Sequence, residues 1–156
     1  MKPTVLIAES DAELRYAYRR FLTGRGYDVE TAADGLDCLE KLRRVTPVVL
    51  VLDRGLRWGG ADGVLAWLRE GSATSEVSVV LTATAGNPPD AAGDIEPPVV
   101  AFLTKPLGLA ALLESVRGLM ARTGRERPFN SNRVSAAPEH YRLIRRNVPW
   151  PSPPPS

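Results

Sequence analysis

An unbroken apolar run at residues 48–52, directly before Asp53, is the feature that most constrains the fold of this chain. Its apolar residues do not alternate with polar ones, so both faces of the segment must be buried. A run this short, apolar on both sides, is typical of a central strand in a parallel sheet covered by helices. The run therefore predicts a layered α/β domain.

Four more short apolar runs and four helical patterns complete this architecture. The predicted strands are residues 5–8, 28–32, 48–52, 77–83 and 99–103. Apolar spacings of three and four predict helices over residues 11–23, 35–44, 62–70 and 107–122. This alternation predicts a doubly wound, five-stranded parallel sheet with right-handed crossovers. In such sheets, function gathers at the carboxyl ends of the strands.

The connection between the last two predicted strands departs from the pattern. Residues 84–98 contain four prolines and two glycines but only one large apolar residue. Proline removes a backbone donor and clashes inside a helix. We therefore expect a loop or at most one turn, so that the fourth helix is shortened or missing.

Composition divides the chain near residue 122. Residues 1–122 carry 14 Lys/Arg and 16 Asp/Glu, whereas residues 123–156 carry six Arg, two Glu and seven prolines. We expect a folded domain over 1–122 and a basic, Pro-rich, disordered tail over 123–156. The tail is too short for a DNA-binding domain, so nucleic acid is not an expected partner.

The apolar stretches and the cysteine and histidine counts restrict the expected location and cofactors. No apolar stretch approaches the roughly 18 residues of a membrane span, and the first residues lack a signal-peptide core. We expect a cytoplasmic protein with no membrane partner. One cysteine, Cys38, and one histidine, His140, exclude an intrachain disulfide and a Cys/His metal cluster. Cys38 lies in a helical pattern and is expected to be inert and partly buried.

Polar residues follow the predicted strands at the edge where function is expected. They are Glu9, Ser10 and Asp11 after the first strand, Asp53 after the third, Thr82 in the fourth and Lys105 after the fifth. The topology therefore brings an acidic cluster, a hydroxyl and one lysine to the same edge.

With these motifs in this order, residues 3–122 resemble the receiver domain of bacterial two-component response regulators. The resemblance implies a flavodoxin-like sheet in the order 2-1-3-4-5 and transfer of a phosphoryl group from a phosphohistidine. It implies that Asp53 is the phosphoacceptor, that Thr82 and Lys105 contact the phosphoryl group, and that Phe102 is the switch aromatic. A histidine kinase or phosphotransfer protein is the implied partner.

The resemblance also implies Mg²⁺ as a cofactor, because a carboxylate that attacks a phosphoryl group is an anion approaching an anion. The implied ligands are Glu9, Asp53 and the backbone carbonyl of Gly55, with Ser10 or Asp11 as a further ligand. Mg²⁺ typically takes one or two carboxylates and completes its octahedron with waters.

Two departures from the family pattern weaken this metal site. Ser10 stands where the family usually has an acid, and its capping-box spacing favours a role as the helix cap instead. The loop after Asp53 is lengthened, so that residues 62–63 lie nine and ten residues past it. The insert carries Trp58 on a backbone expected to be flexible. Its side chain is interpreted as a lid, a partner contact or a group folded against the domain.

Three functions stay open on this basis. The first is a stand-alone receiver that is phosphorylated on Asp53 and signals by docking to proteins. The second is a degenerate receiver that binds a partner without phosphotransfer. The third, a flavodoxin-like enzyme or nucleotide binder, is disfavoured because no Gly-rich phosphate loop follows the first strand. The resemblance implies a signalling domain and not an enzyme, and pairing of two copies through the fifth strand and final helix.

Overall fold

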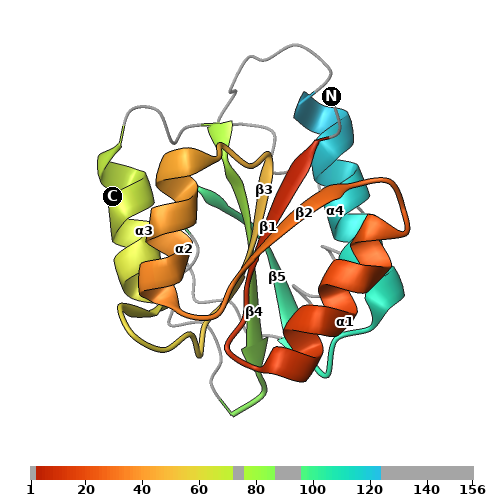
Figure 1. The fold of residues 1–156 in the computed structure, drawn as a ribbon, viewed down its shortest axis with the longest axis horizontal. Coiled ribbons are helices and arrows are strands. Elements are labelled where there is room, and N and C mark those ends of the chain that lie inside the picture. Colours follow the sequence, from red (N-terminus) through yellow and green to blue (C-terminus); the bar gives the residue numbers. More distant parts are fainter. Residues whose placement is uncertain (1–2, 72–75, 87–95, 124–156) are drawn as a thin grey trace, which may run out of the picture.

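The computed structural model describes residues 3–71, 76–86 and 96–123 of the chain. Its centre is a five-stranded sheet in the spatial order β2-β1-β3-β4-β5, with every neighbouring pair parallel (Figure 1). The strands are β1 (Thr4–Ala8), β2 (Asp28–Ala32), β3 (Val49–Asp53), β4 (Ser78–Thr84) and β5 (Val99–Lys105). The predicted strand number, direction and order are confirmed.

Helices among the described residues cover both faces of the sheet (Figure 1). One face carries α1 (Ala12–Thr23) and α4 (Leu109–Thr123), and the other carries α2 (Gly35–Arg44) and α3 (Gly60–Glu70). This is the expected doubly wound, flavodoxin-like arrangement. None of these described helices is long and apolar enough to cross a membrane.

Two predictions fall wholly or largely outside the described residues. The predicted tail begins at residue 123, and the description ends with that residue. The connection at 84–98 is described only at its two ends, where no helix forms between β4 and β5.

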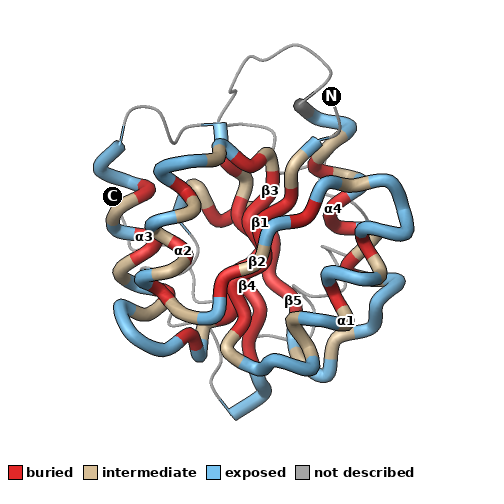
Figure 2. The backbone as a smooth tube through the Cα atoms, in the orientation of Figure 1, coloured by how far each residue is buried: buried red, intermediate tan, exposed pale blue. Residues whose placement is uncertain are grey.

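Each face of the sheet has its own buried layer. Alternate residues of a strand point to opposite faces, so β3 divides its side chains between the two layers. Every residue of β3 is buried, as its non-alternating run predicts (Figure 2). Cys38 lies in the α2–α3 layer and is fully buried, more so than expected, and burial raises the pKa of its thiol to about 12.

Several boundaries differ from the predicted ones for local reasons. The last strand continues past its apolar run to Lys105, because Thr104 and Lys105 still pair with β4. Helix α3 begins at Gly60, two residues before the predicted start, and α4 begins at Leu109 instead of residue 107.

The lengthened loop after Asp53 is held against the amino end of α2. The amides of Gly35 and Leu36 donate to the carbonyls of Arg57 and Trp58, at 2.8 and 3.0 Å. These amides are among the helix-terminal donors that have no partner inside the helix. The predicted flexible backbone is therefore anchored, although the Trp58 side chain is 74% exposed and does not fold against the domain.

The docked loop needs unusual backbone geometry. Trp58, Gly59 and Gly60 have φ values of 49°, 90° and 60°, the left-handed region that favours glycine. For a residue with a Cβ, such as Trp58, this conformation costs roughly 1–2 kcal/mol. The two hydrogen bonds that backbone amides of α2 donate to the loop offset that cost.

Gly35 is required by this close approach, and Gly35→Ala tests it. A Cβ at this position would lie 2.6 Å from the Trp58 carbonyl oxygen and 2.8 Å from the Gly60 nitrogen, both backbone atoms. We expect a loss of about 1–3 kcal/mol in the free energy of unfolding, measured by urea denaturation.

Gly63→Ala in α3 is the matched control, because a Cβ there meets no atom within 4 Å. Removing an interior helical glycine should stabilise the protein by about 0.5–1 kcal/mol. Equal stabilities for the two variants would contradict the close packing of the loop on α2.

Candidate functional site

The polar residues predicted to lie at one edge of the sheet do lie there, because strand register aligns them. Asp53 pairs directly with Thr82 in the β3–β4 ladder. Glu9 directly follows β1, whose last residue pairs with the residue before Asp53, so Glu9 is level with Asp53. Side chains two apart on a strand share a face. The three site residues thus continue the buried rows of Ile7, Val51 and Val80 on the α1–α4 face.

Lys105 connects this row by reaching back from β5. Its Nζ lies 2.5 Å from Glu9 Oε2 and 3.1 Å from Asp53 Oδ1. Its ammonium is therefore shared by two carboxylates. All three side chains are largely buried, with 12% of Lys105, 3% of Glu9 and 9% of Asp53 exposed. The backbone amide of Gly55 also donates to Asp53 Oδ1, at 3.1 Å.

The pKa values of Glu9 and Lys105 are both raised in this cluster, but for different reasons. The pKa of Glu9 is raised, chiefly by burial and also by the Asp53 charge, although Lys105 and the Asp11 amide oppose the rise. Burial lowers the pKa of Lys105, but its interactions with Glu9 and Asp53 outweigh burial, so that this pKa is raised. The lysine therefore stays charged, while Glu9 is easier to protonate than a solvated glutamate.

Two buried hydroxyls at this end of the α1–α4 layer have no hydrogen-bond partner among the described residues. One is Thr82 Oγ1, beside Asp53 in the sheet. The other belongs to Tyr18, a buried residue of α1. Burial raises the pKa of Tyr18, and the charges of Lys105, Glu9 and Asp53 all act on its phenol. The Tyr18 oxygen is thus close enough to the site to sense its charges.

The cap of α1 is Asp11, and the prediction that Ser10 caps this helix is wrong. Asp11 Oδ1 accepts from the amides of Glu13 and Leu14, at 2.9 and 3.0 Å. Ser10 Oγ instead accepts from the backbone amide of Arg57, at 3.2 Å. Asp11 has extended backbone angles directly before the first helical residue, which is the geometry of a cap. Its Oδ1 is therefore engaged at the start of α1.

Arg15 makes contacts near the site that the sequence pattern did not indicate. Its guanidinium donates to the backbone carbonyls of Glu9 and Ser10, at 2.8 and 3.4 Å. It fixes the backbone that carries Glu9. Arginine on a polar helix face usually contacts solvent, so no sequence signal distinguished it.

Phe102, the predicted switch aromatic, lies on the other face of β5. It is buried and packs in the α2–α3 layer, away from the face that carries Asp53. Its switch role stays a prediction.

The donors at this edge fit a hard cation such as Mg²⁺ only in part. Glu9 and Asp53 supply two carboxylates, which match the usual protein contribution to a magnesium site. Among the described residues, no group of three or more His, Cys, Asp or Glu side chains is arranged to hold a metal. Ser10 carries a hydroxyl and no carboxylate, and Asp11 Oδ1 accepts from two backbone amides of α1.

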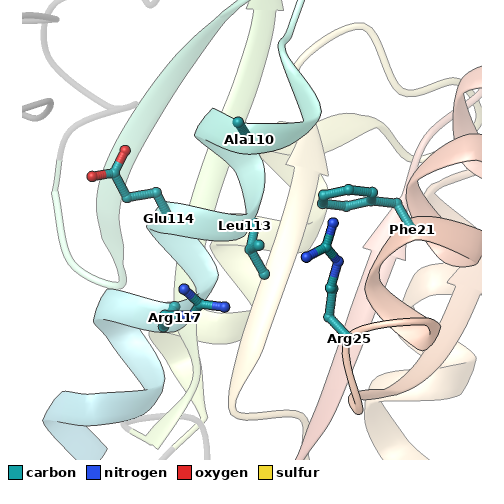
Figure 3. Close-up of a pocket in the computed structure, with 6 residues that line it drawn as sticks. All are labelled: Phe21, Arg25, Ala110, Leu113, Glu114 and Arg117. Atoms are coloured by element: carbon teal, nitrogen blue, oxygen red, sulfur yellow. The ribbon is translucent and has the colours of Figure 1, made fainter.

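A separate groove lies between α1 and α4 (Figure 3). Its volume is about 480 Å³, and it is lined by Phe21, Arg25, Ala110, Leu113, Glu114 and Arg117. The Arg25 guanidinium stacks over the Phe21 ring, 4.8 Å from its centroid. None of the predicted site residues lines this groove, so the chemistry is assigned to the sheet edge.

Thr82→Val tests whether the unpaired hydroxyl destabilises the folded protein. Burying a hydroxyl without a partner is unfavourable, and valine has nearly the same shape. We expect the free energy of unfolding to rise by about 1 kcal/mol, measured by thermal or urea denaturation. Thr84→Val, at an exposed position of β4, is the control and should change stability by less than about 0.5 kcal/mol. A loss of stability in Thr82→Val would show that the hydroxyl has a stabilising partner.

Glu9→Gln tests the raised pKa of Glu9. An acid whose pKa is raised by folding contributes stability below its unfolded pKa, and this contribution is lost as pH rises through the folded pKa. The variant should therefore gain in melting temperature relative to the native protein as the pH rises above about 4.5, the ordinary pKa of a glutamate. Glu30→Gln, on the exposed side of β2, controls for loss of one negative charge. A difference that stays constant across this range would contradict the raised pKa.

The comparison with known protein families agrees with this geometry. Residues 5–117 match the model of the response regulator receiver domain. The transcriptional regulatory protein PrrA of Mycobacterium leprae is 26% identical over 136 residues, which are 87% of this chain and 58% of PrrA. The response regulator MprA of the same organism is 29% identical over 119 residues, which are 76% of this chain and 51% of MprA. The chain thus spans about half the length of these relatives.

Solved structures show the same fold. The receiver domain of the Francisella response regulator 1452 superposes with a TM-score of 0.70 at 22% identity, covering 78% of this chain and 99% of that one. The chemotaxis response regulator CheY4 of Vibrio cholerae superposes with a TM-score of 0.68 at 22% identity, covering 76% of this chain and 99% of that one. Together with the match over residues 5–117, the site geometry leads to one conclusion: this chain belongs to the response regulator receiver domain family.

Proposed function

We propose that this chain accepts a phosphoryl group on Asp53 and signals by docking to a protein partner. The observation that carries the proposal is the position of Lys105, whose ammonium lies 3.1 Å from Asp53 Oδ1 and 2.5 Å from Glu9 Oε2. Response regulators interact with histidine kinases and phosphotransfer proteins, and such a protein is the phosphodonor in this proposal. The chain acts as an acceptor and signalling domain and not as a turnover enzyme.

The described residues have the roles that phosphoryl transfer requires. Both the Lys105 and the Gly55 contacts fall on Asp53 Oδ1, so Oδ2 is the oxygen expected to attack phosphorus. The new bond joins Oδ2 to phosphorus, and the bond between phosphorus and the donor's histidine nitrogen breaks. Lys105 neutralises charge on the transferred oxygens, and the unpaired Thr82 hydroxyl donates to one of them.

Glu9, Asp53 and the backbone carbonyl of Gly55 are the groups proposed to hold Mg²⁺. When bound, the ion supplies positive charge that offsets repulsion between the carboxylate and the phosphoryl oxygens. The burial that raises the pKa of Glu9 makes its ionised form costly, and a cation nearby relieves that cost. With only two carboxylates available, we expect weaker magnesium binding than a three-acid site would give.

A second function is favoured by the engagement of Ser10 and Asp11. The Ser10 hydroxyl accepts from the Arg57 amide, and the Asp11 carboxylate caps α1. The Lys105 ammonium already neutralises part of the carboxylate pair without a metal. These features suit a degenerate receiver that binds its partner independently of phosphorylation.

Phosphorylation by a small donor separates the two functions. The full chain is incubated with Mg²⁺ and acetyl phosphate, and its mass is measured before and after hydroxylamine, which cleaves acyl phosphates. The receiver proposal expects a hydroxylamine-labile phosphoryl adduct that disappears in Asp53→Asn. The control Asp28→Asn removes an exposed carboxylate from β2 and should retain the adduct.

Two outcomes would favour the degenerate receiver. One is the absence of any adduct on the native chain. The other is an adduct that persists in Asp53→Asn, which would place the modification on a different residue.

A further inference from the structure

Ser10 occupies a position between two loops of the site. It follows Glu9 in the connection from β1 to α1, and its hydroxyl reaches the loop that follows Asp53. The bond joins Ser10 Oγ to the backbone nitrogen of Arg57, two residues that are 47 positions apart. Arg57 itself is an exposed residue.

Other contacts anchor the same loop on both sides of Arg57. The amide of Arg54 donates to the Thr82 carbonyl at 2.7 Å, and the amide of Leu56 donates to the Asp53 carbonyl at 3.1 Å. Further along, the carbonyls of Arg57 and Trp58 accept from the first amides of α2. Ser10 ties this loop to the β1–α1 connection, where Glu9 lies.

The loop conformation matters to Asp53 because the loop also contacts its carboxylate. The Gly55 amide donates to Asp53 Oδ1, and a Cβ at Gly55 would stand 3.6 Å from both carboxylate oxygens. A shift of this loop would therefore change how Asp53 Oδ1 is held. The Ser10 hydroxyl binds the loop at Arg57, two residues after Gly55, and so acts on Gly55 through the backbone between them.

We propose that Ser10 is a positioning residue: its hydroxyl tethers the lengthened loop at Arg57 and so holds Gly55 against the Asp53 carboxylate. This inference rests on the proposed role of Asp53 as the phosphoacceptor. It assigns Ser10 to the loop and not to the metal. A neutral hydroxyl is a weak ligand for Mg²⁺ but a good acceptor for a backbone amide.

Amide hydrogen exchange of the metal-free chain tests the tether directly, by NMR, with Ser10→Ala and Ser10→Thr. Losing one such hydrogen bond should speed exchange of the Arg57 amide roughly two- to tenfold in Ser10→Ala. Ser10→Thr keeps a hydroxyl and should restore slow exchange. Thr23→Ala, at the exposed end of α1, removes a hydroxyl remote from the loop and should leave Arg57 unchanged.

Magnesium titration of the same variants separates the tether from metal ligation. A positioning role expects any fall in the Mg²⁺ affinity of Ser10→Ala to accompany the faster Arg57 exchange, because the proposed ligand Gly55 lies in the tethered loop whereas Ser10 itself supplies no ligand. It also expects slower phosphorylation by acetyl phosphate in Ser10→Ala, with recovery in Ser10→Thr.

Unchanged Arg57 exchange in Ser10→Ala would overturn the tether, whatever the phosphorylation result. Unchanged exchange together with a large loss of Mg²⁺ affinity would assign Ser10 to the metal instead. Failure of the phosphoacceptor proposal would be visible separately, as a native chain that forms no adduct while its Arg57 exchange still depends on Ser10.

Discussion

The Lys105 ammonium, shared by Glu9 and Asp53, is the interaction on which the functional edge of this protein depends. Two largely buried carboxylates side by side repel each other, and each loses hydration, so a cation between them stabilises their ionised forms. That cation comes from β5, which is separated from β3 by β4. From this position in the sheet, the Lys105 side chain reaches both acids. The sheet topology thus determines the electrostatics of the site.

The second constraint is the contact between the lengthened loop and the amino end of α2. Three consecutive left-handed residues would be unfavourable in a free loop, and one of them is a tryptophan. The first two amides of α2 donate hydrogen bonds to this loop, and the loop can approach them because Gly35 has no side chain to obstruct it. The loop is therefore a fixed part of the site wall, and it presents Trp58 to solvent at its outer side.

Much of the fold was predictable because strand composition reports burial. The run at 48–52 is apolar throughout since β3 is covered on both faces, and every residue of β3 is buried. Asp53, Thr82 and Lys105 could be placed at one edge because parallel strands share the direction of their carboxyl ends. The helix cap was predicted wrongly, since Ser10 and Asp11 are both good caps and the sequence does not show that the Ser10 hydroxyl accepts from the Arg57 amide instead.

By itself, the sequence determined the α/β layering, the strand order expected of the family and the residues at the strand ends. The layering and the strand ends depend on local patterns of apolar residues, whereas the strand order follows from the resemblance to the receiver family. Tertiary structure alone decided which groups pair: Lys105 with two carboxylates, Arg15 with the carbonyls of Glu9 and Ser10, and Ser10 with Arg57. Most of these contacts join residues far apart in the chain, and several end on backbone atoms that every residue carries. Sequence patterns contain no signal for such atoms, so their partners are set only when the loops pack together.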